Sequence, residues 1–296
     1  MTSHDVVEKL RRMLKLKKIG HAGTLDPNAS GILLACVGKA TKIVQFLTEY
    51  DKEYEAVIKL GITTDTYDQE GKIIQIKDDL KPSEEEVRKA VESFKGETWQ
   101  TPPLYSAIKH QGKKLYQYAR AGRKVERNKR RIFIKDIQVL EINLPYVKLK
   151  VSCSKGTYIR SLAHDIGEKL GCGAYLFSLC RTRVGPFEIK EALDLETIEK
   201  IGSAGKVGDV LISIEKVLAP IPSVVVEDGF AKRIKDGPAL FPSSVLSTEN
   251  KFDKDQMICI KNNQREILAI GKALRPSDDF LDERGKDKLF EYARVL

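Results

Sequence analysis

The sequence predicts an α+β chain in two parts: a mixed first part, residues 1–221, and a small all-β tail, residues 222–296. Helical and strand periodicities of apolar residues both occur in the first part. The segment Leu218–Pro222 contains two prolines, which prevent a helix from continuing through it. After it, short apolar runs alternate with turn residues, the pattern of a small barrel or sandwich. These runs are Val224–Val226, Met257–Ile260 and Ile267–Ile270.

The chain opens with an amphipathic helix. Thr2 and Asp5 have the spacing of a capping box, in which each side chain bonds the main chain of the other residue. The apolar residues that follow at helical spacing are Val6, Val7, Leu10 and Leu14. A second capping box, Ser83 with Glu86, precedes another helical stripe of apolar residues.

Two strands and a third helix are also predicted. Ala56, Ile58 and Leu60 alternate along the chain after Tyr54, which indicates a strand with one buried face. Tyr146–Cys153 alternates in the same way, and apolar residues at helical spacing begin at Ile159. The residues between, Ser154 to Thr157, form a strand-to-helix turn of the kind that holds functional side chains in place.

Composition excludes several classes of protein. The longest unbroken apolar stretch, Ile32–Val37, is far shorter than the roughly 18 residues of a membrane span. The N-terminus has no apolar segment of a secretory signal. The five cysteines include no Cys-x-x-Cys pair, so neither a zinc ribbon nor a disulfide framework is expected. We therefore expect a cytoplasmic protein with no membrane partner.

The net charge of +9 is concentrated in one segment. Between Lys109 and Arg131 the sequence places ten basic residues and one acid, Glu126, so this segment alone carries +9. The basic residues are Lys109, Lys113, Lys114, Arg120, Arg123, Lys124, Arg127, Lys129, Arg130 and Arg131. Tyr116 and Tyr118 are interleaved among them, and such a mixture is typical of a surface that binds nucleic acid. The alternative is a solvated basic face without a partner.

The densest set of chemically useful residues is Gly20–Gly31. Three glycines, a proline and an asparagine predict a sharply turning loop with Asp26 in its middle. The glycine spacing does not match a phosphate-binding P-loop. A turn or capping role for Asp26 and a packed imidazole for His21 are the alternatives to a functional site. With four histidines in the chain and no second His or Cys close to His21, a metal site is not expected.

The whole loop resembles the signature of the TruB family of RNA pseudouridine synthases, Gly-His-x-Gly-x-Leu-Asp-Pro-x-Ala-x-Gly. All eight specified positions match. Other segments similar to the family follow in order as far as about residue 190. They are Asp51–Tyr54 with Leu60–Gly61 and Thr64–Thr66, then Gln100–Ala107 with Leu115–Arg120 and Val125–Arg127, and finally Lys155–Leu162 with Leu170–Ala174.

The resemblance implies the pseudouridine synthase fold, a mixed, largely antiparallel central sheet flanked by helices. It places a small PUA-like β-barrel in the tail, by position more than by residues. It also implies isomerisation of uridine to pseudouridine without a cofactor. In this reaction the base changes its point of attachment to ribose, and no electron or group is gained.

Roles for individual residues follow from the resemblance. Asp26 would be the nucleophile, because a carboxylate can form a covalent intermediate at neutral pH. Arg160 would pair with Asp26 and keep it ionised. Tyr54 would stack on the target base and handle the proton that leaves.

The resemblance also implies contacts to RNA. His21, Tyr158 and Leu179 would line the pocket of the flipped nucleotide, with an ordinary core position as the alternative for Tyr158 and Leu179. Residues of about 104–131 would form a thumb that closes over the T-arm of tRNA, where uridine 55 is the target. The thumb contacts would include Lys109, Tyr116, Arg120, Arg127 and Arg130. No obligate protein partner is implied, and we expect a monomer.

The start of the chain departs from the family pattern. Members usually begin with a strand and a Lys-Pro-x-Gly turn just before the Thr-Ser-His-Asp that stands here at residues 2–5. If a strand is missing, we expect an exposed sheet edge or an open side of the catalytic loop.

Two alternative functions stay open. One is a guide-RNA-dependent, dyskerin-like subunit of H/ACA particles, which shares the aspartate motif but has less need of a long basic thumb. The other is a catalytically inactive RNA-binding or RNA-folding protein, against which the presence of Asp26, Tyr54 and Arg160 counts.

Overall fold

The computed structural model describes residues 1–77, 79, 81–106, 108–123, 125–281 and 287–296, and for Lys109 and Arg120 it describes the main chain alone. The chain divides into two compact units. The first comprises Met1–Leu10, Gly20–Ala35 and Gln45–Asp194, and the second comprises Arg11–Ile19, Cys36–Val44 and Leu195–Leu296.

A seven-stranded sheet forms the centre of the first unit. Its strands are β2 (Ser30–Gly31), β4 (Lys52–Leu60), β7 (Gly96–Gln100), β10 (Arg130–Asn143), β11 (Tyr146–Cys153), β12 (Ala174–Val184) and β13 (Phe187–Glu188). Their order across the sheet is β13, β12, β4, β11, β10, β7, and β2 pairs with β12. The pairing of β2 with β12 is parallel, and the others are antiparallel. The predicted mixed, largely antiparallel sheet is therefore confirmed.

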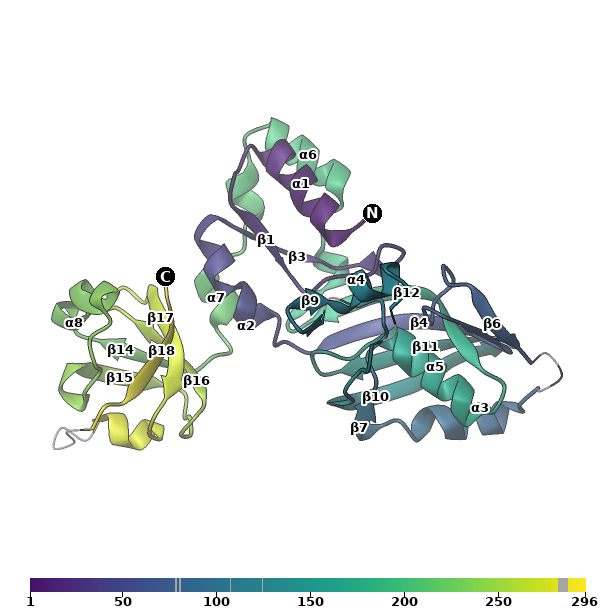
Figure 1. The fold of residues 1–296 in the computed structure, drawn as a ribbon. Helices are drawn as coiled ribbons and strands as arrows, with labels where there is room; N and C mark the ends of the chain where they lie inside the picture. The colour runs from purple at the N-terminus through teal and green to yellow at the C-terminus, as the bar shows by residue number, and fades with distance from the viewer. Residues whose placement is uncertain (78, 80, 107, 124, 282–286) are drawn as a thin grey trace. The chain divides into compact units, whose positions relative to one another are not determined.

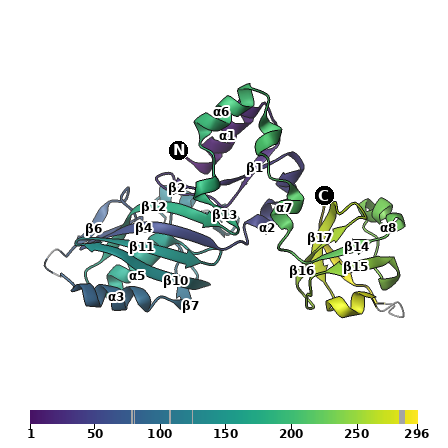
Figure 2. The ribbon, with the colours of Figure 1, turned by 180° about the vertical axis from the view of Figure 1, so that it is seen from behind.

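Helices α3 (Glu84–Glu92) and α5 (Ile159–Lys169) lie along one face of this sheet (Figures 1 and 2). The alternation of β4 buries Tyr54 and Ile58 in the same core cluster as Ile166 of α5. Burial of such side chains contributes about 25 cal/mol per Å² of apolar surface. The face that carries Tyr54 is thus the face that α5 covers.

Both predicted capping boxes form. At the start of α1 (Ser3–Leu14), the main-chain N–H of Thr2 donates to Asp5 Oδ2 at 2.8 Å, and that of Asp5 donates to Thr2 Oγ1 at 3.1 Å. Ser83 and Glu86 exchange equivalent hydrogen bonds at the start of α3. Each box satisfies main-chain donors that a helix leaves open at its first turn.

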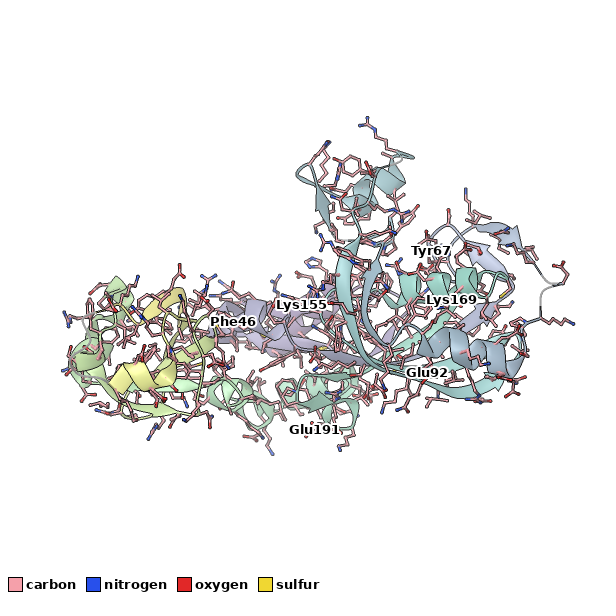
Figure 3. All side chains as sticks on the ribbon, turned by 90° about the horizontal axis from the view of Figure 1, so that it is seen from below. Phe46, Tyr67, Glu92, Lys155, Lys169 and Glu191 are labelled. Atoms are coloured by element: carbon pink, nitrogen blue, oxygen red, sulfur yellow. The ribbon has the colours of Figure 1, made fainter. Side chains whose placement is uncertain are left out.

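Further short elements occur along the chain between residues 19 and 120. They are β1 (Ile19–Ala22) paired with β3 (Leu34–Val37), α2 (Val44–Leu47), β5 (Ile62–Thr64) paired with β6 (Ile73–Ile76), β8 (Lys109–His110) paired with β9 (Lys113–Lys114), and α4 (Leu115–Arg120). Hairpin β8–β9 and helix α4 belong to the basic segment. They stand away from the sheet on the side that α5 covers (Figure 3).

A five-stranded sheet in the order β15, β14, β16, β17, β18 fills the C-terminal part of the second unit. The elements of this part of the chain are α6 (Leu195–Ser203), α7 (Ile214–Leu218), β14 (Ser223–Val226), α8 (Asp228–Arg233), β15 (Val245–Glu249), β16 (Met257–Lys261), β17 (Ile267–Ala273) and β18 (Phe290–Val295). The prediction of an all-β tail was wrong at α8. Phe230 and Ile234, one helical turn apart, are both buried in the core of this sheet, and this spacing favours a helix there.

The described residues bear on two further expectations. In these ranges no helix is long and apolar enough to cross a membrane. All five cysteines are free, and four of them are buried.

Candidate active site

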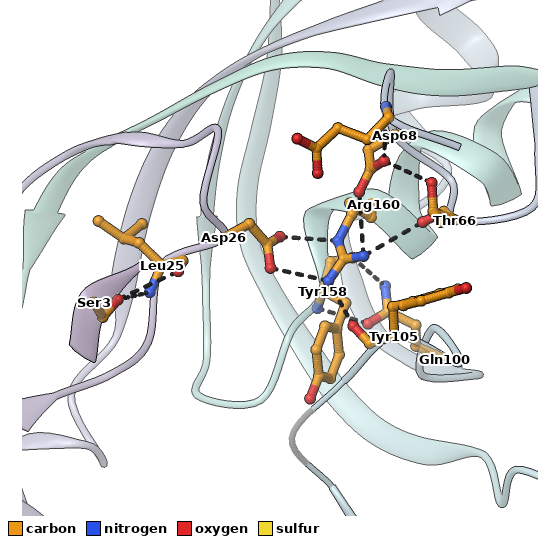
Figure 4. A network of polar contacts seen from close by, with 10 residues as sticks. Ser3, Leu25, Asp26, Thr66, Asp68, Gln100, Tyr105, Tyr158 and Arg160 are labelled. Atoms are coloured by element: carbon orange, nitrogen blue, oxygen red, sulfur yellow. Dashed lines mark hydrogen bonds and ion pairs between the residues drawn. The ribbon is translucent and has the colours of Figure 1, made fainter. Parts of the chain in front are cut away.

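The loop Gly20–Gly31 is anchored beside Asp26 by the first residues of α1. Ser3 is buried, and its Oγ accepts a hydrogen bond of 2.9 Å from the main-chain N–H of Leu25. The same hydroxyl donates to the Leu25 carbonyl at 3.3 Å (Figure 4). The carbonyl of Asp26 in turn accepts from the N–H of Ala29 at 2.9 Å, which closes a turn. These bonds fix the main chain on both sides of the Asp26 carboxylate.

Asp26 faces Arg160 of α5. The Arg160 Nη2 donates to Asp26 Oδ1 at 2.9 Å, and Arg160 Nε lies 2.8 Å from Asp26 Oδ2 (Figure 4). The guanidinium therefore contacts both carboxylate oxygens, one through a charge-assisted hydrogen bond from Nη2 and the other through an ion-pair contact of Nε. The Arg160 side chain is 6% exposed, whereas that of Asp26 is 39% exposed. Arg160 therefore holds one side of the carboxylate, and the rest of the Asp26 side chain is accessible to solvent.

Three further acceptors orient Arg160. Its Nη2 also donates to the Tyr105 carbonyl at 2.9 Å, and its Nη1 donates to the Thr66 carbonyl at 3.4 Å and to Asp68 Oδ2 at 3.2 Å. Asp68 was missed in the sequence, although Thr64–Thr66 was recognised just before it. The available signal was a further carboxylate close to that matching segment. Two carboxylates thus share one buried guanidinium.

The pKa of Asp26 is raised above its usual value. Burial is the largest cause, the Arg160 charge and hydrogen bond oppose it, and the negative charges of Asp68 and Glu70 add to it. A more basic carboxylate is a better nucleophile, so this balance suits a group that must form a bond to carbon.

Tyr54 lies in the floor of the site on β4 and is 9% exposed. Burial raises the pKa of its phenol to about 12, while the charge and hydrogen bond of Arg181 oppose this rise and the charge of Asp26 adds to it. The hydroxyl is therefore protonated at neutral pH. The negative charge of Asp26 thus acts on the Tyr54 phenol.

Tyr158 precedes α5 and is half-buried. The buried Gln100 clasps its main chain: the Tyr158 N–H donates to Gln100 Oε1 at 2.8 Å, and Gln100 Nε2 donates to the Tyr158 carbonyl at 3.0 Å (Figure 4). Burial raises the pKa of the Tyr158 phenol, and the negative charge of Asp26 raises it further. This aromatic ring thus lies close to the carboxylate.

His21 and Leu179 lie on β1 and β12. The imidazole of His21 is half-buried, and its Nδ1 has no hydrogen-bond partner in the part of the chain that the structure describes. Burial lowers the pKa of His21, and the nearby Arg181 charge lowers it further, so the ring is neutral at physiological pH. Leu179 is partly buried against the core cluster that contains Tyr54.

The basic segment divides into two groups of side chains. Arg127 and Arg131 have protein partners, because Arg127 Nη1 donates to the Pro102 carbonyl at 3.1 Å and Arg131 forms an ion pair with Glu97. Tyr116 lies under the Lys114 ammonium, with 5.7 Å from Nζ to the ring centroid. The exposed basic residues that have neither an ion pair nor a ring contact in the described part of the chain are Lys113, Arg123, Lys129 and Arg130. The side chains of Lys109 and Arg120, and all of Lys124, lie outside the described residues.

The site does not resemble a metal centre. In the ranges that the structure describes, no group of three or more His, Cys, Asp or Glu side chains could hold an ion. The groups that interact with Asp26 are instead the guanidinium of Arg160 and the phenols of Tyr54 and Tyr158.

A largely antiparallel sheet that presents an arginine-held aspartate beside a buried tyrosine defines the class of pseudouridine synthases. The model of the TruB family pseudouridylate synthase N-terminal domain matches residues 11–159, and that of the tRNA pseudouridylate synthase B C-terminal domain matches residues 160–226. A PUA domain model matches residues 222–287. The chain belongs to the TruB family, so the resemblance predicted from the sequence is confirmed.

Relatives cover almost the whole chain. The tRNA pseudouridine synthase B of Clostridium tetani is 48% identical over 280 residues, which are 93% of this chain and 96% of that protein. The protein of the same name from Bacillus licheniformis is 46% identical over 302 residues, 100% of this chain and 94% of that protein.

Solved structures share the fold. An archaeal box H/ACA sRNP Nop10-Cbf5 complex contains a chain that superimposes with a TM-score of 0.77 at 27% identity, covering 100% of this chain and 82% of that one. A Cbf5-Nop10-Gar1 complex gives a TM-score of 0.78 at 30% identity, with 100% and 81% coverage. The predicted pseudouridine synthase fold with its C-terminal PUA domain is confirmed.

Proposed function

We propose that this chain is a stand-alone tRNA pseudouridine synthase that isomerises uridine 55 in the T-arm of tRNA. The observation that carries the proposal is the Asp26 carboxylate, gripped on both oxygens by Arg160 and open on its other face. The relatives named tRNA pseudouridine synthase B support tRNA as the substrate.

The reaction needs few chemical groups. The bond from ribose C1′ to uracil N1 breaks, the base turns over, and a bond from C1′ to C5 forms. The proton on C5 leaves to solvent and N1 takes up a proton, so atoms and electrons balance without a redox cofactor. What the protein must supply is a nucleophile, a group that handles the C5 proton and a pocket that holds the base.

Each of these tasks has a candidate residue. Asp26 attacks the substrate, and Arg160 keeps it ionised and aimed. Tyr54 stacks on the base, and its hydroxyl, protonated at neutral pH, takes part in moving the proton. The ring of Tyr158 and the apolar side chain of Leu179 enclose the base, and the neutral His21 contacts the flipped nucleotide.

RNA recognition belongs to two parts of the chain. A stacked uridine must be flipped out of its loop at a cost of a few kcal/mol, which contacts to the RNA backbone repay. The exposed basic residues of the thumb supply such contacts. The thumb comprises about residues 104–131 and belongs to a catalytic domain of residues 1–221. The PUA-like domain, residues 222–296, supplies further contacts to the same tRNA. We place the enzyme in the cytoplasm as a monomer.

The test is incubation of the pure protein with unmodified tRNA transcript, followed by mapping of pseudouridine. We expect modification at position 55 and none in a transcript with cytidine there. The experiment contains no second RNA and no second protein, so activity excludes the guide-dependent alternative. Refolding of tRNA without pseudouridine would instead support an RNA-folding protein and contradict the proposal.

A further inference from the structure

Arg181 is a buried residue of β12 that the proposed reaction does not use. It is 1% exposed. Its Nε donates to the carbonyl of Ile32 at 2.8 Å and its Nη2 donates to the carbonyl of Gly23 at 3.1 Å. Its own carbonyl accepts from the N–H of Ile32 at 2.9 Å. One side chain therefore joins the two ends of the loop that carries Asp26.

The loop has glycine where it approaches Arg181. Gly31 pairs with Arg181 in the parallel β2–β12 ladder at a φ of +105°, and a Cβ there would lie 2.2 Å from the Arg181 carbonyl oxygen. Gly23 has a φ of +85°, and a Cβ there would lie 3.4 Å from Arg181 Nη1. A side chain at Gly31 would push the loop away from β12. The loop and the arginine therefore fit each other closely.

The charge of Arg181 is unusual for a buried position. In the described part of the chain no carboxylate forms an ion pair with it, and the groups that it bonds, the carbonyls of Ile32 and Gly23 and the Tyr54 phenol, are uncharged. A buried charge without a counter-charge costs stability, because it loses hydration that neutral dipoles replace only in part. An apolar side chain would fill this strand position at lower cost.

The same guanidinium reaches the floor of the site. Arg181 stands opposite Tyr54 in the pairing of β12 with β4, and its charge and hydrogen bond act on the Tyr54 phenol. Its charge also acts on the His21 imidazole. One residue therefore touches the nucleophile loop and influences both neighbouring site residues.

We propose that Arg181 is a positioning residue of this site, which ties Gly23 to Ile32 so that Asp26 and the Tyr54 hydroxyl meet the flipped uridine in reactive geometry. The inference rests on the proposed function, since it concerns the rate of that reaction. A misplacement of about 1 Å at a reacting group can cost about 10²-fold in rate. The hydrogen bonds of Arg181 hold the loop that carries Asp26 at both of its ends.

The main test compares Arg181→Met and Arg181→Lys with the wild type. The rate of the chemical step is read in single turnovers, as tritium released from C5-labelled uridine in tRNA, and tRNA affinity is read by filter binding. We expect Arg181→Met to lose about 10²-fold in rate while affinity stays within about threefold. Arg181→Lys keeps the charge, but one ammonium cannot hold both carbonyls in the same geometry. Its single-turnover rate should therefore exceed that of Arg181→Met by less than tenfold. Gly31→Ala, which displaces the loop from the other side, should show the same split.

A matched control and a spectroscopic signature separate this role from general stability. Arg183→Met removes an arginine from the same strand, whose partners are Glu53 and the Gly185 carbonyl, and should keep the wild-type rate. With four histidines in the chain, the His21 ring can be followed by NMR. Because Arg181 and His4 are the charges that lower the pKa of His21, Arg181→Met should raise it and Arg181→Lys should not.

The outcomes distinguish the two proposals. If the wild-type protein forms no pseudouridine in tRNA, both are overturned. If the wild type is active and folded Arg181→Met reacts at the wild-type rate, only the positioning role is overturned. If Arg181→Met does not fold, Arg181→Lys decides in its place, and a wild-type rate in that variant overturns the inference.

Discussion

Because Asp26 and Asp68 share the guanidinium of Arg160, removing Arg160 and removing the charge of Asp68 should shift the pKa of Asp26 in opposite directions. Arg160→Met removes the charge and the hydrogen bond that lower the pKa of Asp26, so that pKa should rise further. Asp68→Asn removes a negative charge that raises it, so the pKa of Asp26 should fall. Because the reaction needs ionised Asp26, the acidic limb of the pH–rate profile should move to higher pH in the first variant and to lower pH in the second.

The size of the effect follows from the contacts. Removing one partner of a buried ion pair costs about 3–5 kcal/mol, and since Asp26 is 39% exposed and screened by water, we expect about 2–3 kcal/mol for Arg160→Met. Removal of the guanidinium that holds the nucleophile should slow the chemical step by about 10²-fold or more. Asp68→Asn keeps an acceptor oxygen for Arg160 Nη1, so we expect a destabilisation of about 1 kcal/mol.

The assay is single-turnover pseudouridine formation between about pH 5 and 8 at constant ionic strength, a range that covers a raised carboxyl pKa. Asp136→Asn serves as the control, because Asp136 is a carboxylate that pairs with Lys95 away from Asp26. Its profile should coincide with that of the wild type. Acidic limbs that move in the same direction in Arg160→Met and Asp68→Asn, or that do not move at all, would refute the assignment of Asp26 as the group that titrates.

Asp26→Asn should abolish turnover and leave tRNA affinity within about threefold. It should not lower the melting temperature at pH 7. The pKa of Asp26 is higher in the folded than in the unfolded chain, so at any pH above the unfolded-state pKa the negative charge destabilises the fold. Residual multiple turnover in that variant would exclude Asp26 as nucleophile. Tyr54→Phe keeps the stacking ring, so the single-turnover rate should fall while binding is unchanged; equal rates would remove the hydroxyl from the mechanism. Alanine at four exposed thumb residues together should weaken tRNA binding and flatten the slope of log K against log salt by about one for each phosphate that the variant no longer neutralises, with an unchanged melting curve. The four residues are Lys113, Arg123, Lys129 and Arg130. An unchanged slope would show that they face solvent only, and Lys148→Ala with Lys150→Ala, which removes two ion-paired lysines of β11, is the control.

Local pattern was sufficient for elements whose two faces differ. The alternation over Tyr146–Cys153 coincides with β11 residue for residue, because one face of that strand packs in the core and the other meets solvent. The helix that begins at Ile159 was predicted for the same reason, since its apolar stripe is buried against the sheet. The helix α8 was missed because it has six residues, and the spacing of Phe230 and Ile234 covers a single helical turn, which is too short for a periodic pattern to stand out.

The candidate site was predicted unevenly. Asp26, Tyr54 and Arg160 came from a family resemblance, since turn chemistry alone leaves Asp26 a capping residue. Asp68 and Arg181 were missed although each touches the same machinery. In a sequence, a single carboxylate in a turn or a single arginine in a strand is ordinarily expected to be exposed to solvent. Only the fold reveals that Arg181 is fully buried.

The reason lies in where the contacts of Arg160 come from. Its partners Asp26, Asp68 and Tyr105 are 134, 92 and 55 residues away along the chain. Each lies in a loop, and no local periodicity marks a loop residue that will meet a distant helix. Arg160 leaves water when β4, α5 and their neighbouring strands pack around one core, and this packing leaves carboxylates and carbonyls as its acceptors. Helices and strands can therefore be predicted from their own residues, whereas this site depends on the long-range packing that brings three loops to one arginine.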